Sequence, residues 1–126
     1  MNANERKPTG LDELLPQEIT AAAVRTPAGN EWVIPLPEVK QAIGLASANL
    51  IAVLGVESFR ILEDGLGCQS YTGYAFDFQG DWPAYVRQNN EAALRFIEES
   101  QLGKGYGYIL TTTSEDEFKS LEAKTP

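Results

Sequence analysis

Apolar residues recur along this chain at the spacings of both helices and strands, which predicts a mixed fold. In the first half, a stripe at intervals of three and four residues predicts one helix over about 37–54. The end of this stretch, LIAVLGV, also suits a strand that begins at Leu50, so helix and strand both remain open over residues 50–54. The members of the stripe are Val39, Ile43, Ala46, Leu50 and Val53.

The second half carries clearer boundary signals. Asp81 is a good N-cap for a helix over about 82–102. Residues 105–112 form a β-favouring run, and Ser114 with Glu117 makes a capping box for a last helix. These signals predict the order helix, strand, helix.

Between the two long helices the pattern predicts a hairpin, with strands over 56–63 and about 70–79 and a turn at Asp64-Gly65. Because side chains alternate along a strand, an even-numbered loop puts the large apolar residues of both strands on one face, towards the core. That face is predicted to hold Phe59, Ile61, Tyr74, Phe76 and Phe78. The opposite face is predicted to hold Ser58, Arg60, Tyr71, Gly73 and Asp77.

The N-terminal part is harder to assign. Residues 19–25 and 31–35 are predicted to be two short strands joined by a turn-rich patch at 26–30. Residues 1–17 are predicted to be a flexible leader, in which LDELL can form one helical turn. The rest of the chain, residues 18–126, is then a single domain.

The predicted fold is α+β, with the order β-β-α-β-β-α-β-α and a mostly antiparallel sheet that has helices on one face. Its middle, strand-helix-hairpin-helix-strand, is the order of a ferredoxin-like split βαβ core. A chain of 126 residues is long enough to bury one core without disulfides or metals.

Charge narrows the class of partner. The chain has 18 acidic and 10 basic residues and a formal charge of -8, which argues against nucleic acid or anionic membranes as partners. The charge is compatible with a basic protein partner, although acidic proteins are commonly acidic for solubility alone. The single cysteine, Cys68, and the polar N-terminus favour a cytoplasmic location, and no apolar run is long enough to span a bilayer.

The chain has no histidine, which excludes histidine-dependent nucleophilic catalysis and nearly all zinc sites. We therefore expect no cofactor, no metal site and no recognisable catalytic site, and Cys68 is expected to be inert. Carboxylate chemistry stays open, because several acids could gather around the hairpin. The run GKGYG follows a helix and precedes a strand, which is the wrong end of a helix for holding phosphate.

The run NLIAVLGVESFRILEDG, followed by a strand and then GDWP, resembles a segment of small bacterial immunity-type proteins, which bind and neutralise a cognate toxin. The similarity covers about residues 37–65. This resemblance implies a binding role, and it assigns a function to no single residue.

Three functional hypotheses follow. The first is a non-enzymatic protein-binding module, of the immunity-inhibitor type, that covers a basic partner. The second is a small-molecule-binding domain or a carboxylate-using enzyme with a pocket between sheet and helices. The third is a homodimer that forms through the sheet. The candidate binding residues of the first hypothesis are Glu57, Glu63, Asp64, Tyr71 and Asp77.

Overall fold

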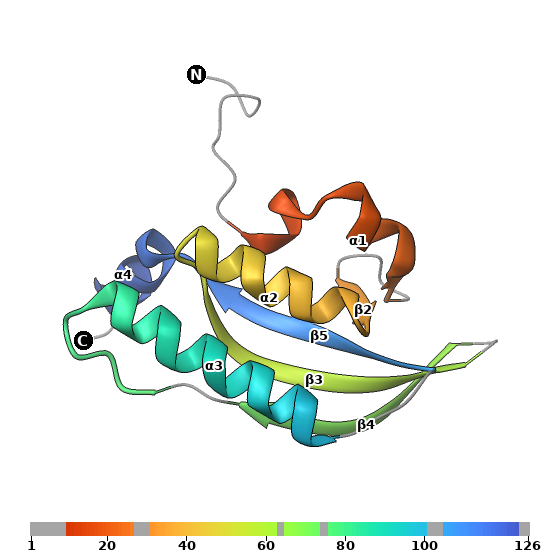
Figure 1. Cartoon of the computed structure of the whole chain (residues 1–126). Coiled ribbons are helices and arrows are strands. Elements are labelled where there is room, and N and C mark those ends of the chain that lie inside the picture. The colour runs from red at the N-terminus through yellow and green to blue at the C-terminus, as the bar shows by residue number, and fades with distance from the viewer. Residues whose placement is uncertain (1–9, 27–30, 63–64, 74–75, 101–104, 124–126) are drawn as a thin grey trace.

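The computed structural model describes residues 10–26, 31–62, 65–73, 76–100 and 105–123, with the backbone alone at 62, 65–73 and 121–123. Four α-helices, one 3-10 helix and five strands are found in these ranges, and Figure 1 shows their arrangement. They are η2 (Leu11–Leu14), α1 (Gln17–Ala22), β1 (Val24–Arg25), β2 (Trp32–Pro35), α2 (Glu38–Ala48), β3 (Ala52–Leu62), β4 (Gly65–Gly73), α3 (Trp82–Ser100), β5 (Tyr106–Thr113) and α4 (Glu115–Ala123).

The strands form one sheet in the order β1-β2-β5-β3-β4, in which every neighbouring pair is antiparallel. Helices α2 and α3 lie side by side across one face of it (Figure 1). The predicted α+β class is therefore confirmed. Both crossovers are of the split βαβ type, because β5 lies between β2 and β3, and β3 lies between β5 and β4. In the unit β2-α2-β3-β4-α3-β5, the central strands are the second and the fourth, β3 and β5. A ferredoxin-like sheet instead has its first and third strands in the centre, so the strand order differs from that of a ferredoxin-like core.

The main core lies between the sheet and these two helices. The buried stripe of α2 packs on side chains from β2, β3 and β5, and α3 adds Ala93 and Ile97. Each large aliphatic side chain buried here stabilises the fold by about 1.5–3 kcal/mol. The buried residues of α2 are Val39, Ala42, Ile43 and Ala46.

Helix α2 ends at Ala48, six residues before the predicted end at 54, and β3 already begins at Ala52. The chain reverses at Leu50, whose φ of 55° no helix can contain. The indole N–H of Trp82 donates to the Leu50 carbonyl over 2.7 Å and holds this turn. Val53 therefore reaches the core from a strand, and its helical spacing from Leu50 was coincidental.

The prediction of a loose leader is wrong for the residues after 10. Leu11 is 3% exposed and joins the main core from η2, which forms within the predicted LDELL turn. The predicted strand over 19–25 is also wrong, because α1 takes most of it and places Ile19 in the core. Pro16 precedes α1, and the alanines that follow favour a helix. The predicted antiparallel pairing with the next strand survives as the two-residue β1.

The hairpin exists, but its second strand begins at 65 instead of 70. Its register pairs Phe59 with Cys68 and Ile61 with Leu66, and it shifts between Ser58 and Phe59. The faces of β3 were also predicted wrongly, because the other set of its alternate residues packs on the helices. Val56 and Ser58 are fully buried, and Val56 packs in the main core, so Phe59 and Ile61 point away from the helices.

The remaining boundaries agree with the sequence. The Ala84 N–H donates to the Asp81 carboxylate over 3.2 Å at the start of α3. The Glu117 N–H donates to the Ser114 hydroxyl over 3.2 Å, and the Ser114 N–H donates to the Glu117 carboxylate over 3.1 Å, which is the predicted capping box. Strand β5 occupies 106–113, one residue from its predicted span.

Candidate binding surface

The side of the sheet opposite α2 and α3 carries a mixed acidic and apolar surface on β3. Glu57, Phe59 and Ile61 alternate with residues that face the core, and all three are half-buried. In the register, Glu57 lies directly between Tyr71 on β4 and Ile109 on β5. We call this set of five positions the outer sheet face. Ile109 is only 4% exposed, so the part of this face that can meet a partner lies on β3 and β4.

The structure brings together two of the five predicted binding residues. Glu57 and Tyr71 are cross-strand partners, which places their Cβ atoms within about 5.5 Å of each other. Asp77 is exposed and lies outside any strand, in the segment between β4 and α3. Glu63 and Asp64 lie outside the described residues.

A glycine shapes the centre of the sheet beside this face. Gly107 on β5 pairs with Phe59 of β3 on one side and with Pro35 of β2 on the other. A Cβ at Gly107 would lie 2.6 Å from Cγ1 of Val33, which is fully buried. The absence of a side chain at 107 therefore allows β2 to pack closely on β5.

Two buried asparagines of α3 were not predicted as functional residues, and both fix loops. The Asn90 carboxamide accepts from the Val53 N–H over 2.8 Å and donates to the Ile51 carbonyl over 3.0 Å and the Ser47 hydroxyl over 2.9 Å. Asn89 accepts from the Phe76 N–H over 3.4 Å, in the segment that leads from β4 to α3. Their sequence signal was two polar residues interrupting the apolar stripe of a helix.

The aromatic residues of the second half are mostly structural. Trp82 and Tyr85 are buried in a second core cluster, against which the partly buried Phe78 and Phe118 pack with ring centroids 5.3–6.0 Å apart. Tyr108 is fully buried, and its hydroxyl lies 3.1 Å from that of Ser100. Trp82, Tyr85 and Tyr108 therefore pack the fold and are not available to a partner.

A groove of about 160 Å³ lies between the end of α2 and the outer side of α3. Leu50, which is 48% exposed, forms part of its wall, and Arg87 and Glu91 bring charge to it. Its lining residues are Ser47, Leu50, Pro83, Val86, Arg87, Asn90, Glu91 and Leu94.

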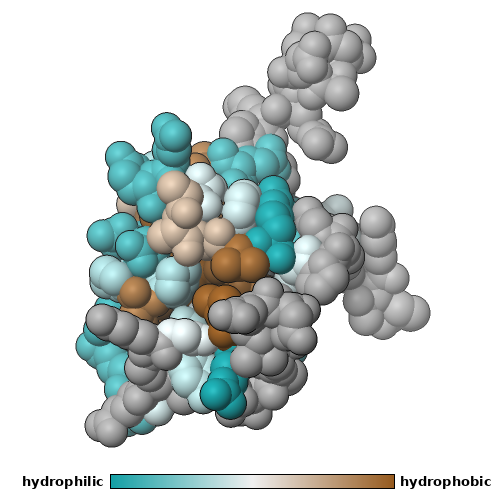
Figure 2. Space-filling model, turned by 90° about the vertical axis from the view of Figure 1, so that its right-hand side faces the viewer, coloured by the Kyte–Doolittle hydropathy of each residue, from teal (hydrophilic) through white to brown (hydrophobic). Residues whose placement is uncertain are grey.

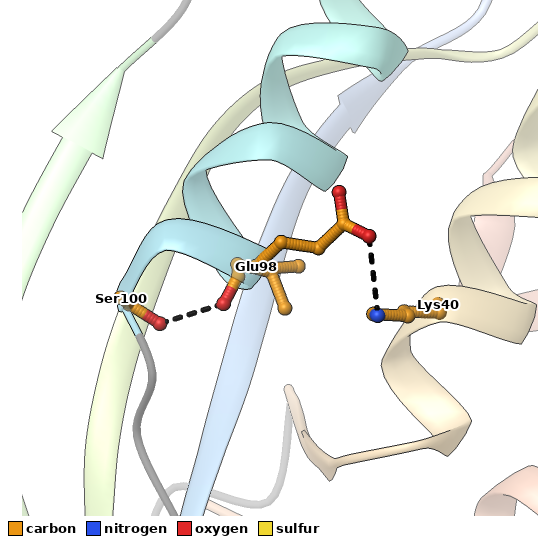
Figure 3. A network of polar contacts seen from close by, with 4 residues as sticks. Lys40, Glu98 and Ser100 are labelled. Atoms are coloured by element: carbon orange, nitrogen blue, oxygen red, sulfur yellow. Dashed lines mark hydrogen bonds and ion pairs between the residues drawn. The ribbon is translucent and has the colours of Figure 1, made fainter.

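At the other end of the same helix pair, Lys40 of α2 and Glu98 of α3 form an ion pair over 3.4 Å (Figure 3). Ser100, also drawn there, donates to the Ile97 carbonyl over 2.8 Å and ends α3. Because both side chains of the ion pair are largely exposed, it contributes at most about 1 kcal/mol.

The N-terminal elements hold a small charged cluster. The Arg25 guanidinium lies 3.9 Å above the Trp32 ring, and burial raises the pKa of the Asp12 carboxyl, although the Arg25 charge opposes this. Asp12, Glu31 and Trp32 line a cavity of about 30 Å³ beside β5. This cavity is about the size of one water molecule, so the cluster is a packing feature.

Figure 2 turns the molecule to show the end on the right of Figure 1. Hydrophobic side chains gather near the middle of this end, and hydrophilic ones lie along part of their border.

In the described part of the chain, no Asp or Glu side chain is buried, and no three His, Cys, Asp or Glu side chains are grouped to hold a metal ion. None of the described helices is both long and apolar enough to span a membrane. Comparisons with protein-family models, curated proteins and solved structures found no match to this chain.

Proposed function

We propose that this chain is a non-enzymatic protein-binding module that covers a basic partner, in the manner of an immunity-type inhibitor. One observation carries the proposal: Glu57 lies opposite Tyr71 on the face away from α2 and α3, beside the half-buried Phe59 and Ile61. A tyrosine and apolar side chains next to a carboxylate supply both contact area and charge to an interface.

The charge of the whole chain supports the same reading. A formal charge of -8 accelerates the encounter with a basic partner, and this acceleration falls as salt is added. The resemblance of residues 37–65 to immunity-type proteins also supports a role in binding a partner protein. The single cysteine fits action in the reducing cytoplasm.

The test is a capture experiment with a tagged full-length chain in lysate of its source organism, at low and moderate salt. A basic protein retained by the wild type should be lost or weakened with Glu57→Gln and Phe59→Ala. Glu18→Gln is the control, because it removes one exposed charge from α1, far along the chain from the outer sheet face. If the Glu57→Gln and Phe59→Ala variants retain the basic protein as well as the wild type does, the proposal is contradicted.

A second candidate function is small-molecule binding, which the groove between α2 and α3 favours. Apolar walls beside Arg87 and Glu91 suit a small amphipathic ligand. The space between sheet and helices is filled by apolar side chains, so such a ligand would use this outer groove. Fragment screening by protein NMR would then shift Ser47 and Leu94, and hits confined to other surfaces would remove this candidate.

A further inference from the structure

The sheet ends in two very different edge strands. At one edge, β1 has two residues. At the other, β4 has nine, and within the described residues its one strand partner is β3. An edge strand presents a row of unpaired N–H and C=O groups that another chain can pair with.

The sequence of β4, GLGCQSYTG, contains neither a charged residue nor a proline. Charges and prolines are the usual means by which edge strands avoid pairing with other chains. The short β1 has such protection, since one of its two residues is Arg25. The bulge at Gln69 is the one protective feature of β4, and the long edge lacks the charge that protects the short one.

We propose that β4 accepts an extended segment of the partner protein, which adds to the sheet as a sixth strand. This inference rests on the proposed function and names how the partner is held. Strand addition would extend the outer sheet face by one strand beyond Tyr71, so the partner's side chains would continue the surface that carries Glu57.

The charges around β4 indicate the charge of the added segment. Glu57 lies opposite Tyr71 near the C-terminal end of β4, and the exposed Asp77 follows that end by four residues. In the sequence, Glu63 and Asp64 directly precede Gly65, the first residue of β4. Acidic residues therefore adjoin both ends of the strand, and the segment should be basic.

The same charges argue against a second copy of this chain as the occupant. Two copies paired through β4 would bring two bodies of charge -8 together. Such a dimer would also add no basic residue from the opposing β4 to meet Glu57.

The probe is the blocked peptide acetyl-Lys-Lys-Thr-Val-Thr-Val-Thr-amide, added to the full-length chain and followed by backbone amide NMR. We expect the largest shifts within residues 66–72. The same peptide with both lysines replaced by glutamate should bind at least a few-fold more weakly, since exposed charge pairs contribute up to about 1 kcal/mol. Proline in place of the second of the three threonines should weaken binding by about tenfold, because it removes a hydrogen bond between the peptide and β4.

Variants at Gln69 test the edge without removing a registered pair, because the β3–β4 register passes from Cys68 to Ser70 and leaves 69 unpaired. Gln69→Lys should weaken binding of the lysine peptide, and Gln69→Glu should strengthen it. Circular dichroism of both variants establishes that they fold.

Absence of binding, or shifts confined to the groove between α2 and α3, would overturn strand addition. Light scattering could instead show a dimer that becomes a monomer with Gln69→Lys. That result would mean that a second copy of this chain, and not a partner segment, occupies the edge of β4. Both results are separable from the proposed function. A partner whose capture depends on Glu57 and Phe59 but is indifferent to Gln69→Lys would uphold that function without β4.

Discussion

Asn90 is the single polar residue whose removal should do the most damage to this fold. Its side chain satisfies two backbone groups of the crossing from α2 into β3, the Val53 N–H and the Ile51 carbonyl, and all three residues are buried. Asn90→Ala would leave both groups without this partner in the protein interior. The hydroxyl of Ser47, the third partner, belongs to an exposed residue and can turn to water.

The magnitude follows from the two backbone groups. Each buried donor or acceptor left unsatisfied costs about 1–3 kcal/mol, so the variant should lose about 2–6 kcal/mol of unfolding free energy. Domains of this size are stable by only about 5–15 kcal/mol, so this loss is a large share of the total.

Urea unfolding followed by far-UV circular dichroism measures the effect. With a slope of about 2 kcal/mol per molar urea, the middle of the usual range, the midpoint should fall by roughly 1–3 M. Gln88→Ala on the exposed side of the same helix is the control, and it should change stability by less than about 0.5 kcal/mol. A loss below about 1 kcal/mol in Asn90→Ala would refute the idea that these bonds hold the crossing.

Three further predictions use the same unfolding assay. Gly107→Ala should destabilise by about 1–3 kcal/mol, because its Cβ would meet a buried valine of β2 at 2.6 Å. Gly44→Ala in α2, with nothing within 4 Å, should instead stabilise by about 0.5–1 kcal/mol, and equal effects at both glycines would contradict the packing argument. Burial raises the pKa of Asp12 above 3.8, which favours its protonated form in the folded state. Its contribution to stability is therefore present below pH 3.8 and is lost at higher pH, so Asp12→Asn should match the wild type in acid and exceed it at pH 7. Because Asp12 is exposed in part, the gain should stay below about 0.5 kcal/mol, and a loss at pH 7 would contradict it. A double-mutant cycle on Lys40 and Glu98 should give a coupling free energy of at most about 1 kcal/mol, and added salt should remove it because the pair is exposed. A coupling free energy that is unchanged at high salt would contradict this prediction.

Boundaries set by local chemistry could be read from the sequence. The Asp81 cap and the box of Ser114 and Glu117 each involve atoms three residues apart, so their signals lie within a short window. The end of α2 could not be read this way. It depends on bonds that Trp82 and Asn90 make to the chain more than 30 positions away.

The hairpin failed for a different reason. Its strands were recognised from composition, but alternation alone did not show which face of β3 meets the helices, because Val56 lies on one face and Phe59 and Ile61 on the other. The structure starts the second strand five residues earlier than predicted, and Gln69 falls out of the pairing. Glu57 and Tyr71 were both chosen as binding residues from sequence, yet their being direct neighbours became visible only once the register was known.

The most direct test of the binding proposal is hydrogen–deuterium exchange of the full-length chain, alone and with its captured basic partner. Binding through the outer sheet face predicts new protection within residues 56–61 of β3 and 66–72 of β4, with little change along 83–94 of α3. Protection confined to 83–94, which lines the groove between α2 and α3, would contradict the proposal and favour that groove as the working surface.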